Sequence, residues 1–250
     1  MFRYLTNAST NAYDVAALTA HSVKHVGYAV RRHKLLFKQF YDVGNRSLPI
    51  VTVMGLFVGM VLALQSGYQL TRFRQEAYIG LIGIGIIKEF GPVITAFLLA
   101  GRVGSSYAAE IGTMKVYEEV DALTMMGVQP VAYLATPRLM ACLVMLPILV
   151  IYADFVAMLG GALVAQTYVG VTPSQFFDVF FQWMEMKEVW RSLFKSLCFG
   201  GIIAVTGCHC GFRTTGGAEG VGRSTTESVV YALLAVLIAD YFIEKILLAL

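Results

Sequence analysis

Residues 48–70 of the chain read LPIVTVMGLFVGMVLALQSGYQL and contain no Asp, Glu, Lys or Arg in 23 consecutive positions. About 20 apolar residues in a helix are enough to cross the hydrocarbon core of a bilayer. The whole chain shares this character, since 57% of its 250 residues are hydrophobic, 14% are charged and the mean hydropathy is +0.67. We therefore predict an all-α integral membrane protein with no room for a separate soluble domain.

Four further apolar stretches follow the first, so the sequence predicts five transmembrane helices within one domain over residues 48–250. A proline inside a helix removes a backbone hydrogen-bond donor, and Gly91-Pro92 therefore predicts a kink in the second helix. The third stretch also contains a proline, Pro147. The predicted spans are 48–70, 78–100, 139–165, 193–211 and 229–250.

The later stretches carry ionisable residues, which are unfavourable in lipid and tend to mark functional positions. Lys88 and Glu89 are adjacent, so on a helix their side chains point about 100° apart and cannot pair well with each other. Each needs another partner or a charged lipid headgroup. Salt bridges that only hold the helices together are the alternative interpretation. The candidate partners are Asp154, Lys195, Asp240 and Glu244.

The distribution of Lys and Arg predicts the orientation. Seven of these residues precede the first span, so the N-terminus is expected in the cytoplasm. With five spans, twelve Lys and Arg fall on the cytoplasmic side and four outside, and the C-terminus lies on the opposite, periplasmic side. Within residues 1–47, Val26, Val30 and Phe37 share one side of a helical wheel. This pattern predicts a basic amphipathic helix in the membrane interface.

Residues 113–126, TMKVYEEVDALTMM, alternate apolar and charged residues at helical spacing. Gly127 and Pro130 are expected to end this helix. It is too short and too charged to span, so we predict that it docks in a groove of a partner protein, with a solvated connector as the alternative. The residues expected to take part are Thr113, Met114, Lys115, Glu118, Glu119, Asp121, Leu123 and Met126.

Several other chemistries find no support in the sequence. There is no GxSxG or HExxH motif, and an enzyme is not expected. Cys208-His209-Cys210 offers three consecutive ligands that cannot surround one zinc ion, so no metal site is predicted. Residues 217–224, GAEGVGRS, have P-loop spacing but carry Arg223 in place of the lysine. We interpret this segment as a glycine-rich loop between two spans, with no nucleotide or nucleic acid bound.

Four motifs occur in order along the chain. They are KEFGPV at 88–93, AGRVGSSYAAEIGTM at 100–114, EEVDALTMMGVQP at 118–130 and GAEGVGRSTTESVV at 217–230. Together they resemble the MlaE (YrbE) family of permeases, which belong to bacterial ABC transporters that work with MCE proteins. The similarity extends from about residue 39 to the C-terminus.

The resemblance implies a permease subunit that forms a homodimer and does not hydrolyse ATP itself. ATP and Mg would bind in a partner, a cytoplasmic ABC ATPase dimer seated on the coupling helix at 113–126. The other implied partners are a periplasmic MCE protein, expected as a hexameric ring, and a small STAS-type cytoplasmic subunit. The implied location is the inner membrane of a Gram-negative type of bacterium. The implied cargo is a glycerophospholipid carried between inner and outer membranes, which maintains outer-membrane lipid asymmetry.

The resemblance also implies a lipid-binding cavity between the two copies. Glu119 departs from the family pattern, where many members have Gln, and adds negative charge to the coupling helix.

The alternative function is a proton- or ion-coupled secondary transporter with an intramembrane relay of Lys88, Glu89, Asp154 and Asp240. The predicted substrate-binding residues are Lys88, Glu89, Lys195, Leu62, Leu70 and Phe73.

Overall fold

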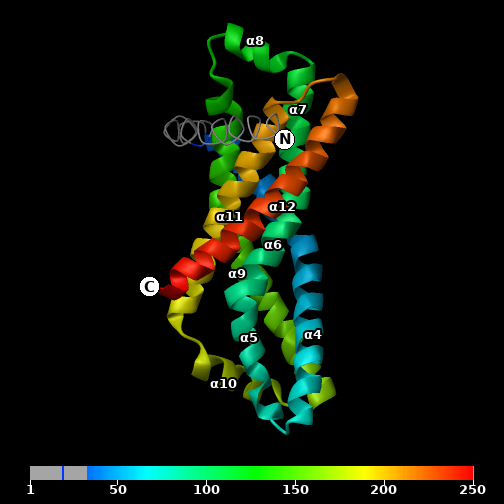
Figure 1. The fold of residues 1–250 in the computed structure, drawn as a ribbon, viewed down its shortest axis with the longest axis vertical. Coiled ribbons are helices and arrows are strands. Elements are labelled where there is room, and N and C mark those ends of the chain that lie inside the picture. The colour runs from blue at the N-terminus through cyan, green and yellow to red at the C-terminus, as the bar shows by residue number, and fades with distance from the viewer. Residues whose placement is uncertain (1–18, 20–32, 250) are drawn as a thin grey trace, which may run out of the picture.

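The computed structural model describes Thr19 and residues 33–249, and every regular element that these residues form is a helix. This confirms the all-helical prediction. Figure 1 shows the helices running lengthwise through an elongated molecule, with α8 (Glu119–Met125) at one end and α10 (Pro173–Trp183) near the other. Most of the interfacial helix predicted within residues 1–47 lies outside the described residues. Its described part is α3 (His33–Phe40), which a π-helical turn at Tyr41–Asn45 follows.

Within the described residues, four helical assemblies are long and apolar enough to cross a membrane, as expected of a multi-pass membrane protein. The first contains α4 (Leu48–Arg72), which matches the predicted first span closely. The third contains α9 (Thr136–Val164), and the fourth is α11 (Met186–Phe212). The full assemblies are Lys34–Arg72, Glu76–Val116, Val131–Val169 and Met186–Phe212.

The second assembly is a chain of short helical segments joined end to end. Its central part, α6 (Gly91–Leu99), lies between two π-helical turns, Ile86–Phe90 and Ala100–Gly104. The first π turn ends where Gly91-Pro92 predicts a kink, because Pro92 has no N–H to continue the α-helical pattern. Outside these turns lie 3-10 turn η2 (Glu76–Leu81), α5 (Ile82–Gly85) and α7 (Ser105–Val116).

The last helix, α12 (Gly217–Ala249), has 33 residues and packs along α7 and α11, but it is not among the four candidate spans. The fifth transmembrane helix therefore stays a prediction. The prediction of a glycine-rich loop at 217–224 is wrong, because these residues form the first turns of α12. Only Gly216 and Gly217, with φ of +91° and +71°, need the freedom of glycine to turn the chain from α11 into α12.

Small residues bring α4 and α9 into direct contact. Gly55, Gly59, Ala63 and Gly67 recur every four residues on the buried side of α4. A Cβ atom at Gly59 would overlap the backbone carbonyl of Ala157 on α9. Two helices can approach this closely only when side chains are missing from their interface, as in membrane helix pairs generally. α9 also packs against α11, α6 and α3, which makes it the central helix of the bundle.

The helix α10 was not predicted from the sequence. Thr172 caps its first turn, accepting a hydrogen bond from the Gln175 N–H while the Gln175 side chain accepts one from the Thr172 N–H. This reciprocal pair is a capping box, and Pro173 occupies the first position, where its missing N–H has no consequence. Phe176 and Phe180 anchor the helix by burial against the turn that begins the second assembly.

Candidate functional site

A cluster of ionised side chains is centred on Lys195. Its ammonium is fully buried and lies 2.8 Å from Glu89 Oε1, 3.1 Å from Asp240 Oδ1 and 2.8 Å from Glu244 Oε2. The side chains come from α11, from the π turn before α6 and from α12, so the cluster joins three elements that are distant in sequence. One cation therefore holds three carboxylates together.

A second set of ion pairs adjoins the first through neighbouring residues. Lys88 Nζ lies 3.0 Å from Glu188 Oε1, and Arg191 Nη1 lies 3.4 Å from the same carboxylate oxygen. Arg191 also donates to the carbonyl of Leu247 at the end of α12, at 2.9 Å. Lys88 and Glu89 thus take different partners, as their adjacency predicts. We call the seven residues of both sets the Lys195 cluster: Lys88, Glu89, Glu188, Arg191, Lys195, Asp240 and Glu244.

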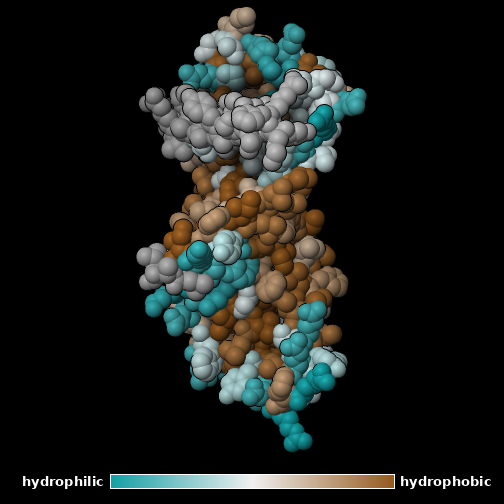
Figure 2. Space-filling view, in the orientation of Figure 1, coloured by the Kyte–Doolittle hydropathy of each residue, from teal (hydrophilic) through white to brown (hydrophobic). Residues whose placement is uncertain are grey.

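The Lys195 cluster is only partly shielded. The side chain of Glu89 is 39% exposed and that of Lys88 also 39%, although Lys195 between the helices is inaccessible. In Figure 2 a hydrophilic patch interrupts the apolar surface about halfway along the molecule, near the start of α11 and the end of α12 in Figure 1. The cluster contains four carboxylates and three cations. It can therefore present both a cation and a surplus carboxylate to a bound polar group.

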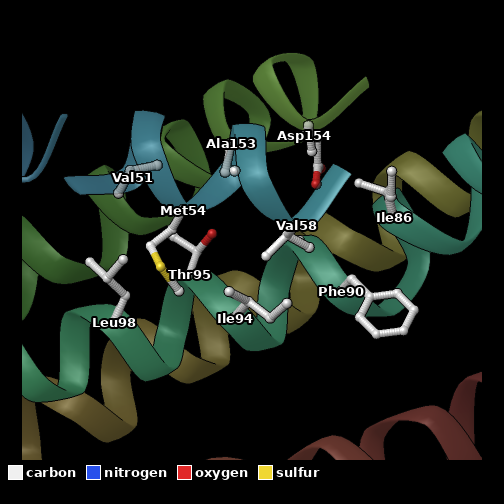
Figure 3. Close-up of a pocket in the computed structure, with 13 residues that line it drawn as sticks. Val51, Met54, Val58, Ile86, Phe90, Ile94, Thr95, Leu98, Ala153 and Asp154 are labelled. Atoms are coloured by element: carbon white, nitrogen blue, oxygen red, sulfur yellow. The ribbon is translucent and has the colours of Figure 1, made fainter. Parts of the chain in front are cut away.

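A narrow apolar cavity lies between α4, α6 and α9 (Figure 3), and Phe90, which directly follows Glu89 in the chain, is one of its lining residues. It leaves about 20 Å³ for the centre of a water-sized molecule, which is room for one water. Most of the side chains that line it and are labelled in Figure 3 are aliphatic or aromatic, and Asp154 is the one acidic side chain labelled there. Asp154 is 7% exposed, and its Oδ1 has no hydrogen-bond partner among the described residues.

The structure separates the predicted apolar lining from the polar pair. Leu70 packs in a satellite cluster with Ile79 and Phe176, near the turn that begins the second assembly. Phe73 is largely exposed and lies against the end of α4. Leu62 is half-buried on α4. The α4 residues that do reach the cavity lined by Phe90 include Val58 and Met54, one and two turns before Leu62 on the helix.

The predicted coupling helix at 113–126 is two helices, which corrects the single helix expected from the sequence. Thr113, Met114 and Lys115 belong to the last turn of α7. Glu118 then adopts a left-handed conformation, with φ of +60°, and α8 starts at Glu119. Since a left-handed residue cannot continue a right-handed helix, the chain turns sharply at this point.

The turn between α7 and α8 is held by an ion pair. Lys115 Nζ on α7 donates to both carboxylate oxygens of Asp121 on α8, at 2.9 and 3.1 Å. Within α8, Val120 is buried and Leu123 is half-buried. Glu118, Glu119 and Met126 are exposed.

Two exposed apolar residues at this tip were missing from the predicted set. Met125 is 91% exposed and Tyr117 is 72% exposed. Large apolar side chains in water at the tip of a helical hairpin are typical of a protein-binding surface. Three apolar residues among the four at 123–126, Leu123, Met125 and Met126, exceed what one buried face of α8 needs, and this is the signal that points to Met125.

Comparison with known proteins agrees with these features. The family model described as Permease MlaE matches residues 36–246. A probable ABC transporter permease protein of Synechocystis sp. is 41% identical over 230 residues, which cover 91% of this chain and 87% of that protein. A second, from Rickettsia typhi, is 39% identical over 214 residues, covering 85% and 83%. The chloroplastic protein TRIGALACTOSYLDIACYLGLYCEROL 1 of Arabidopsis thaliana is 37% identical over 209 residues, covering 83% of this chain and 60% of that protein.

Proposed function

The chain belongs to the MlaE family of permeases, and on this premise we propose that it is the membrane subunit of an ABC transporter that moves a glycerophospholipid. The movement runs between the inner and outer membranes of a Gram-negative type of bacterium and maintains outer-membrane lipid asymmetry. The chain lies in the inner membrane with its N-terminus in the cytoplasm and its C-terminus in the periplasm.

The Lys195 cluster is the observation that carries this proposal. A phospholipid combines a charged head with apolar chains, so its site needs a few ionised groups set in an apolar wall. Lys88 is exposed enough to meet a phosphate, and the surplus carboxylate suits an ammonium group. Met54 and Val58 on α4, together with Phe90, supply the apolar surface next to the cluster. The name of the Arabidopsis relative is that of a diacylglycerol lipid, which supports a lipid cargo.

The energy source and the partners are also part of the proposal. The sequence contains no complete P-loop, so ATP and Mg would bind in a separate ATPase dimer. The tip formed by α7 and α8 would dock on that ATPase. The transporter would contain a second copy of this chain, a periplasmic MCE ring and a small STAS-type subunit.

A continuous path connects the proposed docking tip to the Lys195 cluster. α7 leads from the tip through the π turn at Ala100–Gly104 into α6, and α6 begins two residues after Glu89, at Gly91. ATP-driven movement of the ATPase would displace α8 and α7 together, because Lys115 and Asp121 join them. That displacement would change the spacing of the helices around Glu89 and release or admit the lipid.

Replacing Glu89 with Gln tests the substrate role. The reconstituted complex should lose most of its ATP-dependent lipid transfer between vesicles, while pull-down of the ATPase stays normal. Glu185→Gln is the matched control, because Glu185 is exposed and its ion-pair partner within the described part of the chain is Lys187, at 3.8 Å. Equal transfer by the two variants would remove Glu89 from the proposed site.

The docking assignment is tested with Met125→Asp. This change places a charge on the most exposed apolar residue of α8 and should reduce co-purification of the ATPase several-fold. Met186→Asp is the control, since Met186 is also exposed (71%) but lies at the start of α11. If both variants retain the ATPase equally well, α8 is not the docking element.

The ion-coupled secondary transporter is less well supported by the arrangement of charges. The relay would need Asp154 to communicate with Asp240, but Asp154 is not among the partners of Lys195 and lies in the cavity of Figure 3 instead. Reconstitution of the chain alone, with an ion gradient and no ATPase, separates the two functions. Lipid movement under these conditions would favour the secondary transporter.

A further inference from the structure

A second cavity lies toward the α8 end of the bundle, between α3, α7 and the start of α9. It measures about 170 Å³, several times the space that one water needs. Polar and apolar side chains share its lining. The residues that matter for the argument are Lys38, Asp42, Glu110 and Arg138, with Leu35 and Pro137 as apolar neighbours.

Arg138 is the buried charge of this cavity. It is 6% exposed and lies over the ring of Tyr107, 5.4 Å from the ring centroid. Its Nη1 donates to the Leu134 carbonyl at 2.9 Å and its Nη2 to Glu110 Oε2 at 2.7 Å. Nε is the one nitrogen of this guanidinium with no hydrogen-bond partner among the described residues. A buried donor without an acceptor is unfavourable, so this guanidinium is placed to bind an anion or another acceptor.

The other charged residues that line the cavity are one cation, Lys38, and two carboxylates, Asp42 and Glu110. Lys38 on α3 is exposed, and no described carboxylate lies within 4.0 Å of its ammonium. Asp42 pairs with Arg46 at 3.2 Å, and Glu110 accepts from Ser106 at 3.1 Å in addition to Arg138. Two cations and two carboxylates thus line one cavity. This composition matches a zwitterion better than a simple anion or cation.

The position of the cavity favours a lipid over a soluble zwitterion. α3 precedes α4 by only a few residues, so the cavity lies where the first membrane span begins. Leu35, Leu134 and Pro137 give the cavity an apolar side along which acyl chains can continue. None of its lining residues belongs to the Lys195 cluster, so the two sites are separate.

We propose that this cavity binds the headgroup of an aminophospholipid from the leaflet next to α3. The phosphate lies against Lys38 and the free Nε–H of Arg138, and the ammonium lies between Asp42 and Glu110. Glu110 and Arg138 also border a neighbouring opening lined by Thr113 and Met114 at the end of α7. An occupied headgroup site would therefore contact the same residues that lead to the docking tip.

The experiment measures lipid binding to the full chain in detergent by native mass spectrometry, with phosphatidylethanolamine as the probe. Lys38→Gln should weaken binding about fivefold, because one charge-assisted contact is worth about 1 kcal/mol. Lys34→Gln is the matched control, with the same charge change on the same exposed side of α3 but outside the cavity. Equal affinities for the two variants would overturn the site.

Asp42→Asn tests the ammonium contact. The affinity for phosphatidylethanolamine should fall while that for phosphatidylglycerol, which has no amine, stays the same. A parallel loss for both lipids would overturn the assignment of Asp42.

Inorganic phosphate and phosphoethanolamine test the source of the headgroup. Both should compete with the lipid only weakly, because they lack acyl chains. Displacement of the lipid at comparable concentrations would instead identify a site for free phosphate compounds. The Lys38 effect should persist in Glu89→Gln, so a failure of the transport proposal would not be mistaken for a failure of this site.

Discussion

Two acidic environments lie on neighbouring parts of the bundle and differ in how their charges are compensated. Around Lys195, three carboxylates share one buried ammonium at 2.8 to 3.1 Å. Asp154 is more deeply buried than any of these three carboxylates, at 7% exposed, but its Oδ1 has no partner among the described residues. Replacing Lys195 would leave carboxylates without their cation, which is unfavourable. Replacing Asp154 would instead remove a buried polar group that has no partner, which is not unfavourable. The two regions should therefore respond to substitution with opposite signs.

Lys195→Met should have the largest effect. It leaves Glu89, Asp240 and Glu244 next to one another without their common cation, and breaking a buried ion pair typically costs about 3–5 kcal/mol. The free energy of unfolding, measured by denaturant titration in detergent micelles, should fall by that order. A variant as stable as the wild type would show that the cluster does not stabilise the bundle.

Gly91→Ala should have an intermediate effect that depends on Asp154. A Cβ at position 91 would overlap Asp154 Oδ1, so the carboxylate has to move, at about 1–3 kcal/mol. The same titration in an Asp154→Ala background should show little further loss, since the overlapping atom is gone. Additive losses in the double variant would mean that the two residues are not in contact.

Asp154→Val should have a small effect of the opposite sign. Valine needs no hydrogen bond and leaves no carboxylate without a partner in the bundle, so the unfolding free energy should stay equal or rise by up to about 1 kcal/mol. Transport measured in parallel shows whether the carboxylate has a role beyond stability. A large loss of stability would reveal a partner that stabilises Asp154 in the membrane.

Lys115→Gln should change stability least. The pair of Lys115 with Asp121 is exposed to solvent, and such pairs contribute about 0.2–1 kcal/mol. The unfolding transition should therefore hardly move, whereas ATPase-coupled transport should weaken because α8 is no longer held to α7 by this pair. Raising the salt concentration should reproduce the small stability change in the wild type.

The predicted spans agree with the structure where hydropathy alone decides the helix. The first, 48–70, is nearly the whole of α4. The fourth was predicted to start at 193, but α11 begins at Met186 and includes the charged residues Glu188 and Arg191, which pair with each other at 3.4 Å. A hydropathy window ends at charged residues, whereas the hydrogen bonds of a helix continue past them.

The break at Glu118 had no signal in the sequence. Apolar and charged residues keep their helical spacing across it, and Glu has no special preference for a positive φ. In contrast, the ends of the stretch, Gly127 and Pro130, were predictable from their conformational limits. Residue type thus indicates where a helix must stop, but the choice of a turn within a regular pattern depends on tertiary contacts.

The candidate site was predictable in its residue types but only partly in its grouping. The separation of Lys88 from Glu89 follows from helix geometry. The choice of Lys195, Asp240 and Glu244 over Asp154 as the neighbours of Glu89 depends on how α11 and α12 pack. For the same reason, the sequence favoured Leu62 as apolar lining, but the structure brings Met54 and Val58 to that position.

The two π turns on either side of α6 have a consequence for the surface of the second assembly. Each π turn accommodates about one extra residue, which rotates everything beyond it by about 100° relative to an uninterrupted α-helix. After both turns, α7 is out of phase with α5 by about 200°. If the results of a cysteine-labelling scan over Glu76–Val116 were plotted on an ideal α-helical wheel, the lipid-facing positions would be assigned to the wrong side of the helix. The lipid-accessible side of this assembly should instead change at two places, at Ile86–Phe90 and at Ala100–Gly104.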